Sequence, residues 1–189
     1  MERTEDTDKE PLEKWVIEIL EGKTVNLRLE EKGDMKLVSE WLNNPDYWGE
    51  YLPLKQQSRT EIEKEYDSQP QESKWFIVEK KDGSKIGSIG YFLATGSLVE
   101  IGYSLIPNER GKGYCTEAAK ILVDYLFLSK SIVRVQSHTD VRNLASQRVL
   151  EKTVHFWRTG SASCREGSEG TDSDYVVDES NLGFATHCG

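Results

Sequence analysis

The chain has 189 residues, of which 37% are hydrophobic and 30% are charged, and its formal net charge is −9 at pH 7. This length and balance are typical of one globular domain that is large enough for a hydrophobic core. The negative charge argues against a nucleic-acid partner, which needs a basic face, and mildly favours cationic substrates.

The sequence also lacks the signals of a membrane or secreted protein. No apolar run approaches the roughly 18 residues of a membrane span, and the acidic N-terminus does not resemble a signal peptide. The three cysteines are odd in number and widely spaced, which fits a reducing cytoplasm better than a disulfide framework. Cys164, His187 and Cys188 match no metal-binding spacing, so no metal is expected. We therefore expect a cytoplasmic protein without a membrane partner.

An N-terminal extension, residues 1–23, is predicted to contain a short amphipathic helix. Its apolar residues recur at helical spacing, as in a helix that docks on a domain or lies in a dimer contact. These residues are Leu12, Trp15, Val16, Ile19 and Leu20.

The following segment alternates between strand and helix patterns. Residues 25–29 alternate apolar and polar side chains, which predicts a half-buried strand. Asp34 is placed to cap a helix that ends near Pro45, and Ser58 to cap a second helix that ends near Asp67.

An aromatic segment, residues 47–51, is predicted to be a loop. Its side chains either plug the core or line a pocket for an acceptor substrate, because aromatic residues are common in both settings. Strands are predicted at 75–78 and 85–92, and Asp82-Gly83 between them is a hairpin signal.

The stretch from Val99 to Leu128 organises the rest of the chain. An extended run ends at Pro107, a glycine-rich turn follows, and a helix begins whose apolar residues recur at spacings of three and four. Such a turn suits an anion, because free N–H groups and the helix dipole face it, and Gly111 and Gly113 allow a close approach. The turn matches neither a P-loop nor the dinucleotide fingerprint, and it is also compatible with a simple helix cap.

The segment Arg110-Gly111-Lys112-Gly113-Tyr114-Cys115 resembles the acetyl-CoA loop of the GNAT superfamily of N-acetyltransferases, Arg/Gln-x-x-Gly-x-Gly/Ala. Cys115 replaces the usual Gly or Ala. The resemblance covers residues 24–152 and is greatest to the branch that acetylates ribosomal-protein N-termini and small amines. It implies an α/β fold, the GNAT acyl-CoA N-acyltransferase fold, with a mixed, mostly antiparallel sheet and helices on both faces.

The resemblance also implies an activity and a mode of binding. Acetyl would pass from acetyl-CoA, the co-substrate, directly to a primary amine on a protein N-terminus or a small molecule, with no metal. Residues 110–115 would bind CoA through main-chain N–H groups, and Arg110 and Lys112 would add charge. The main-chain N–H groups of Leu105 and Ile106 would polarise the thioester carbonyl.

Several residues are candidates for proton transfer. Glu100 is the predicted general base, because partial burial in an apolar strand would suit it to that task, although an exposed edge carboxylate is the alternative. By resemblance, Asn143 would bind the pantetheine arm and Ser146 would protonate the leaving thiolate, although helix capping alone also explains both. His138 is a less favoured base. Two further proton donors, Tyr103 and Tyr114, have packing as their more ordinary role.

The resemblance ends where a C-terminal tail, residues 153–189, begins. Relatives continue with a short Gly-Phe turn and a strand pair, whereas this chain has no glycine before Phe156, and only residues 175–177 have clear strand character. Either a divergent tail replaces the last strands, or the C-terminal reading frame differs from that of the relatives. A sheet edge left open would favour a homodimer, and a module that binds CoA without catalysis is the alternative function.

Overall fold

The computed structural model describes residues 19–129, 132–153, 157–163 and 172–178. The strands are β1 (Ile19–Glu21), β2 (Val25–Leu29), β3 (Lys74–Lys80), β4 (Lys85–Thr95), β5 (Leu98–Leu105), β6 (Arg134–Asp140), β7 (Trp157–Ser163) and β8 (Asp172–Asp178). The helices are α1 (Met35–Leu42), α2 (Pro45–Trp48), α3 (Arg59–Asp67), α4 (Tyr114–Ser129) and α5 (Leu144–Lys152), with the 3-10 helices η1 (Lys32–Asp34) and η2 (Pro107–Glu109).

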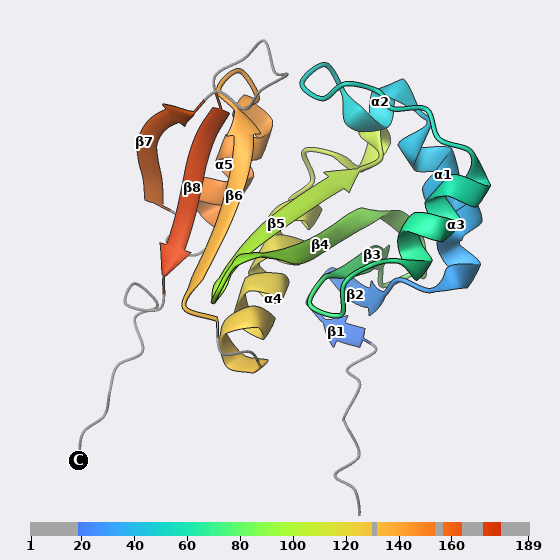
Figure 1. The fold of residues 1–189 in the computed structure, drawn as a ribbon, viewed down its shortest axis with the longest axis horizontal. Coiled ribbons are helices and arrows are strands. Elements are labelled where there is room, and N and C mark those ends of the chain that lie inside the picture. The colour runs from blue at the N-terminus through green and yellow to red at the C-terminus, as the bar shows by residue number, and fades with distance from the viewer. Residues whose placement is uncertain (1–18, 130–131, 154–156, 164–171, 179–189) are drawn as a thin grey trace, which may run out of the picture.

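The strands form one sheet in the order β1-β2-β3-β4-β5-β6-β8-β7 (Figure 1). All neighbours are antiparallel except β5 and β6, which are parallel. A parallel pair needs a crossover connection, and α4 supplies it. The predicted mixed, mostly antiparallel α/β fold is therefore confirmed.

Successive side chains along each strand point to opposite faces of the sheet, and helices cover both faces (Figure 1). One face packs on α4, which packs in turn on α5. Its core includes the fully buried Leu27, Ile89, Ala119, Leu122 and Leu126. The other face packs on α1, α2 and α3, where a second cluster is built from Met35, Val38, Trp41, Tyr47, Ile62 and Ile77. The first cluster therefore holds α4, the helix that follows the glycine-rich turn, against the sheet.

Sequence signals for the first helices were right at Ser58 and for the start of α1 after Asp34, and wrong for the Asp34 side chain and in the aromatic segment. Ser58 and Glu61 form a reciprocal capping box at α3. The Asp34 side chain makes no capping hydrogen bond to α1 and instead accepts from Arg28 and Lys85. In the predicted loop, Tyr47 belongs to α2, which Asn44 caps by accepting a hydrogen bond from the N–H of residue 46.

Both ends of the sheet differ from the sequence-based expectation. Ile19 and Leu20 lie in β1, so the predicted helix is wrong there, and the other residues assigned to it lie outside the described residues. Pairing with β2 overrides the helical spacing, because Glu117 of α4 fixes the β1–β2 turn by accepting from the Thr24 N–H at 2.7 Å. At the other end, β8 pairs with β6 over seven residues and confirms the predicted strand at 175–177. β7 pairs with β8, where the sequence had left the last strands unassigned.

Candidate active site

The central feature of the site is the divergence of β5 from β6. The two strands pair only from Leu98–Glu100 to Arg134–Gln136. Beyond that point β5 continues to Leu105 and β6 to Asp140, and no further pairing between these two described strands follows. Figure 1 shows them separating toward the end of the sheet that carries α2. The gap between them leaves one side of β5 without a strand neighbour.

Main-chain groups of β5 point into this gap in a defined pattern. The Ile106 N–H donates to Ile86 O at 2.9 Å, on the β4 side. Because hydrogen-bonding directions alternate along an antiparallel strand, the N–H of Leu105 points to the opposite side, toward the gap. The Leu105 N–H can therefore donate to a group in the gap, and its role in polarising a thioester carbonyl stays a prediction. The same prediction for Ile106 is wrong, because its N–H is already bound to Ile86.

The glycine-rich turn lies between η2 and α4. Gly111 and Gly113 have φ angles of 74° and 90°, a region that favours glycine. A Cβ at either position would meet no described atom within 4 Å, so the space in front of the turn is open. The first N–H groups of α4 have no intrahelical acceptor. The geometry is therefore that of a main-chain anion site at a helix N-terminus.

The charged residues of the turn have partners of their own. The Arg110 guanidinium donates to three main-chain oxygens, those of Leu105, Asp46 and Tyr47, each at 2.8 Å. It therefore ties the end of β5 to α2. The three acceptors are uncharged carbonyl groups, so the predicted contribution of the Arg110 charge to phosphate binding stays a prediction. Lys112 Nζ lies 2.9 Å from Glu109 and its side chain is half exposed, so it can still reach an anion.

Tyr114 and Cys115, the first residues of α4, both pack against the core. Burial raises the pKa of the Cys115 thiol to about 12, against a small opposing effect of Arg110. The thiol therefore stays protonated at neutral pH, which is unsuited to a nucleophile. Among the described residues no group of three His, Cys, Asp or Glu could hold a metal, and Cys164, His187 and Cys188 lie outside them. No helix in the same part of the chain is long and apolar enough to span a membrane.

Glu100 lies at the point where the strands separate, on the face that α1, α2 and α3 cover. Its Oε2 is 3.3 Å from Gln136 Nε2 and 3.3 Å from His138 Nε2. The side chains of Glu100 and His138 are only 12% and 19% exposed, so Glu100 is not an edge carboxylate in water. The sequence analysis missed Gln136 and ranked His138 second. Their spacing of two in β6, which puts both on the face of Glu100, was the available signal.

A second polar group lies on the opposite face of β5. Ser146 Oγ, in the first turn of α5, is 2.9 Å from Tyr103 Oη, which also donates to the main-chain oxygen of Ser146 at 3.3 Å. Asn143 caps α5 by accepting a hydrogen bond from the Ser146 N–H at 3.1 Å, as the capping alternative expects. The structure thus joins Tyr103 with Ser146, the predicted proton donor.

Two residues of the aromatic segment, Tyr47 and Tyr51, have different surroundings. Tyr47 is 2% exposed, stacks on Trp41 with ring centroids 5.7 Å apart, and plugs the core. The guanidinium of Arg142, in the loop after β6, lies 5.8 Å from the Tyr51 ring centroid. Tyr51 therefore lies beside the loop that follows β6, and its part in lining a pocket for an acceptor stays a prediction.

An open hollow of about 500 Å³ lies beside Gly113, between the β1–β2 turn, α4 and the end of α5. Three lysines from distant parts of the chain line it, Lys23, Lys120 and Lys152. The sequence analysis missed them, because their separation in the chain hides their proximity. They add positive charge next to the glycine-rich turn.

Comparison with known proteins decides the family. The protein family described as "Acetyltransferase (GNAT) domain" matches residues 24–153 of this chain. The chain belongs to the GNAT acetyltransferase family. This membership, together with homologues that are named N-acetyltransferases, shows that the chain is an acyltransferase. The resemblance found in the sequence is therefore confirmed.

Two relatives and one solved structure place this GNAT protein more closely. The probable N-acetyltransferase YjcK of Bacillus subtilis (strain 168) is 30% identical over 175 residues, which cover 84% of this chain and 94% of that protein. The uncharacterized N-acetyltransferase YjdG of the same strain is 32% identical over 80 residues, 41% of this chain and 48% of that protein, so the match spans about half of YjdG. Spermidine N-acetyltransferase from Vibrio cholerae, in complex with CoA and spermine, aligns with a TM-score of 0.73 at 20% identity, over 85% of this chain and 98% of that chain. At this identity the likeness shows the fold alone.

Proposed function

We propose that the chain transfers acetyl from acetyl-CoA directly to a primary amine in the gap between β5 and β6. The observation that carries this proposal is the divergence of the two strands just beyond Glu100 and Gln136. The open side of β5 lies there, together with the Glu100 carboxylate on one face of the strand and the Tyr103–Ser146 hydroxyl pair on the other. These are the groups that acyl transfer to an amine requires.

The phosphates of the co-substrate would lie at the glycine-rich turn. Gly111 and Gly113 leave the N-terminus of α4 open to an anion, and the lysine-lined hollow lies next to it. From there the pantetheine arm would extend along the open side of β5. Asn143 lies on that path at the start of α5, and the Leu105 N–H would hold the acetyl oxygen.

The residues of the gap would divide the proton transfers between the two faces of β5. Glu100 would accept a proton from the ammonium group of the acceptor, Gln136 would hold the carboxylate in place, and His138 would hold it or pass the proton on. As the new C–N bond forms and the C–S bond breaks, the Tyr103–Ser146 hydroxyl pair would give a proton to the leaving thiolate, the nitrogen would lose its second proton to solvent, and the hydroxyl pair would regain a proton from solvent. Glu100 is the base and Ser146 the acid in this scheme, with Tyr103 as its partner.

The acceptor would be a cationic amine. The net charge of −9 favours a positively charged substrate in solution, and a carboxylate at the gap favours one locally. Spermine, which the Vibrio cholerae structure contains, and a peptide with a free N-terminus are therefore the first two acceptors to test.

Calorimetric titration with acetyl-CoA, followed by thiol release against a panel of amines, tests the proposal. We expect binding and amine-dependent release, and a fall in kcat of about 10²- to 10⁴-fold for Glu100→Gln, because removal of a general base costs that much. Glu63→Gln on α3, where Glu63 pairs with Arg59 one turn earlier, is the matched control and should leave kcat unchanged.

The two other outcomes are equally informative. Binding of acetyl-CoA without release by any amine would favour a module that binds CoA without catalysis. Absence of binding would contradict the assignment of the glycine-rich turn, and with it the whole proposal.

A further inference from the structure

A separate cavity of about 280 Å³ lies three strands away from the gap, between the end of β2, the end of α3 and the start of β3. Glu30 lines this cavity together with Tyr66, Asp67, Lys74 and Trp75. Glu30 is only 9% exposed, which is rare for a carboxylate that has no paired charge. None of these residues has a part in acetyl transfer as proposed above.

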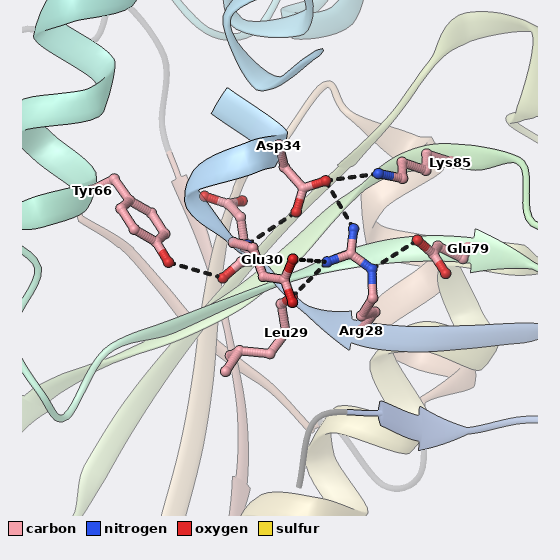
Figure 2. A network of polar contacts seen from close by, with 8 residues as sticks. Arg28, Leu29, Glu30, Asp34, Tyr66, Glu79 and Lys85 are labelled. Carbon is pink, nitrogen blue, oxygen red and sulfur yellow. Dashed lines mark hydrogen bonds and ion pairs between the residues drawn. The ribbon is translucent and has the colours of Figure 1, made fainter. Parts of the chain in front are cut away.

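The Glu30 carboxylate has no hydrogen-bond or ion-pair partner among the described residues. Its main chain is fully used, because its N–H donates to Trp75 O at 2.9 Å and its oxygen accepts from Tyr66 Oη at 3.2 Å. Figure 2 shows Tyr66 reaching toward this oxygen from α3. The main-chain bonds hold the residue in place and leave the carboxylate as the polar group for the cavity.

The two cations of the neighbouring ion-pair network, Arg28 and Lys85, are bound to other carboxylates. Arg28 donates from Nε to Glu79 at 2.9 Å and from Nη2 to Asp34 at 2.8 Å, and Lys85 Nζ lies 2.7 Å from the same Asp34 oxygen (Figure 2). Burial, and then the negative charge of Asp34, raise the pKa of Glu30 to about 7, although Arg28 opposes the shift. Glu30 is thus poised to gain or lose a proton near neutral pH.

Aromatic side chains form part of the cavity wall. The indole of Trp75 lies against Gly90 and reaches Gly102 on the same face of the sheet, and Tyr66 is fixed by its hydrogen bond to Glu30. A carboxylate between aromatic groups suits an organic cation, which gains from the charge and from the ring faces. A divalent metal would need several further oxygen ligands, and an anion would be repelled by Glu30 and Asp67.

We propose that this cavity binds a protonated amine, with the Glu30 carboxylate as its counter-ion. The site is distinct from the gap at Glu100, and the proposal holds whether or not the chain acetylates an amine. The charged or titratable groups around Glu30 are Arg28, Asp34, Tyr66, Asp67 and Lys74. Arg28 and Asp34 are bound to each other, and Asp67 is bound to Lys32. Lys74 is the competing cation of the cavity wall.

Calorimetry with n-butylammonium chloride at pH 7, in phosphate and in MOPS, tests the proposal. The two buffers differ in ionisation enthalpy, so the heats report protons released on binding. We expect the wild type to bind n-butylammonium and to release about half a proton, because Glu30 is about half protonated at this pH and must ionise. n-Butanol, which has the same chain without the charge, should not bind.

Variants locate the bound amine. Glu30→Gln should abolish binding and proton release, whereas Asp67→Asn at the rim of the same cavity should retain both. Thermal unfolding of Glu30→Gln shows whether it folds, and the proton release of the wild type tests the site even if it does not. Loss of binding in Glu100→Gln, with binding retained in Glu30→Gln, would place the amine in the gap and overturn the proposal.

Two further outcomes would also overturn it. If only Lys74→Met binds n-butylammonium, Lys74 is the counter-ion of Glu30 in the native protein. If the wild type acetylates amines yet shows no binding that depends on Glu30, the cavity proposal fails while the proposed function stands.

Discussion

Glu30 and Asp34 lie close together in the chain, yet the pKa values of their carboxyl groups move in opposite directions. Burial raises the pKa of both carboxyls, but Asp34 accepts hydrogen bonds from Arg28, Lys85 and the Glu31 N–H, which together lower it to about 2. Glu30 has no such donor, so burial raises its pKa to about 7. At the scale of single residues, the partners of a buried carboxylate decide its charge.

This contrast predicts an unusual dependence of stability on pH. Because the pKa of Glu30 is higher in the folded state than in the unfolded state, the folded state binds more protons between pH 4.5 and 7. The free energy of unfolding should therefore fall as pH rises through that window. In Glu30→Gln this loss disappears, so the variant should gain about 3 kcal/mol relative to the wild type between pH 4 and pH 8.

Urea unfolding at a series of pH values measures this difference. Asp34 does not obscure it, because its contribution is lost only as pH falls from 3.8 toward 2. Glu40→Gln on the exposed side of α1 is the matched control and should keep the wild-type profile. If the free energy of unfolding of Glu30→Gln changed with pH in parallel with that of the wild type, Glu30 would not titrate in this range.

At the scale of elements, one indole explains why β4 carries a glycine at its centre. Gly90 lies directly opposite Trp75 in the β3–β4 ladder. A Cβ at Gly90 would lie 2.4 Å from Trp75 Cδ2 and 2.8 Å from the Lys74 main-chain oxygen, and the second contact cannot relax by a side-chain rotation. The flat packing of Trp75 therefore depends on the absence of a side chain on its neighbour.

Gly90→Ala should destabilise the protein by about 1–3 kcal/mol, the usual cost of overpacking. It should also weaken n-butylammonium binding, because Trp75 would have to move out of the cavity wall. Gly33→Ala in η1, where a Cβ would meet no described atom within 4 Å, should change stability by less than about 0.5 kcal/mol. Equal stabilities of the two variants, measured by urea unfolding, would contradict the packing argument.

Elements with local signals could be predicted from the sequence, whereas those that depend on distant pairing could not. The Ser58 capping box and the apolar spacing of α4 are written in short stretches, and both predictions agree with the structure. β1 and β7 take their conformation from a neighbouring strand, so a helical spacing and a Gly-Ser-rich sequence misled the analysis.

The site divides in the same way. The glycine-rich turn could be found because its residues are consecutive, and its geometry agrees with the prediction. The partners of Glu100, Tyr103 and Arg110 come from other elements, so the fold is needed to show which residues meet. The Arg110 guanidinium also donates to carbonyl oxygens of α2, a contact that the local sequence does not indicate. A local sequence pattern does not show which residues that are distant in the sequence lie close together in the fold.

At the scale of the whole molecule, acetyl-CoA should act on stability as well as on chemistry. A ligand held in the gap would bind the folded state alone, so at about 100 times its dissociation constant it should add about 2.7 kcal/mol to the free energy of unfolding. Thermal unfolding with and without acetyl-CoA measures this increase. AMP, which lacks the pantetheine arm, is the control and should give a smaller shift. No shift at saturating acetyl-CoA would contradict binding in the gap.

The short ladder between β5 and β6 has a mechanical consequence. Three residue pairs join a five-stranded plate, β1 to β5, to a three-stranded plate, β6, β8 and β7, whereas seven pairs join β6 to β8. The seam between the plates is thus held by a shorter ladder than the one between β6 and β8, and we expect the sheet to bend more easily at the seam than at β6–β8. A substrate lying in it would occupy the position of a missing strand and stiffen the joint, and product release would loosen it again. The two parts of the sheet would then become more rigidly joined and less rigidly joined once in each catalytic cycle.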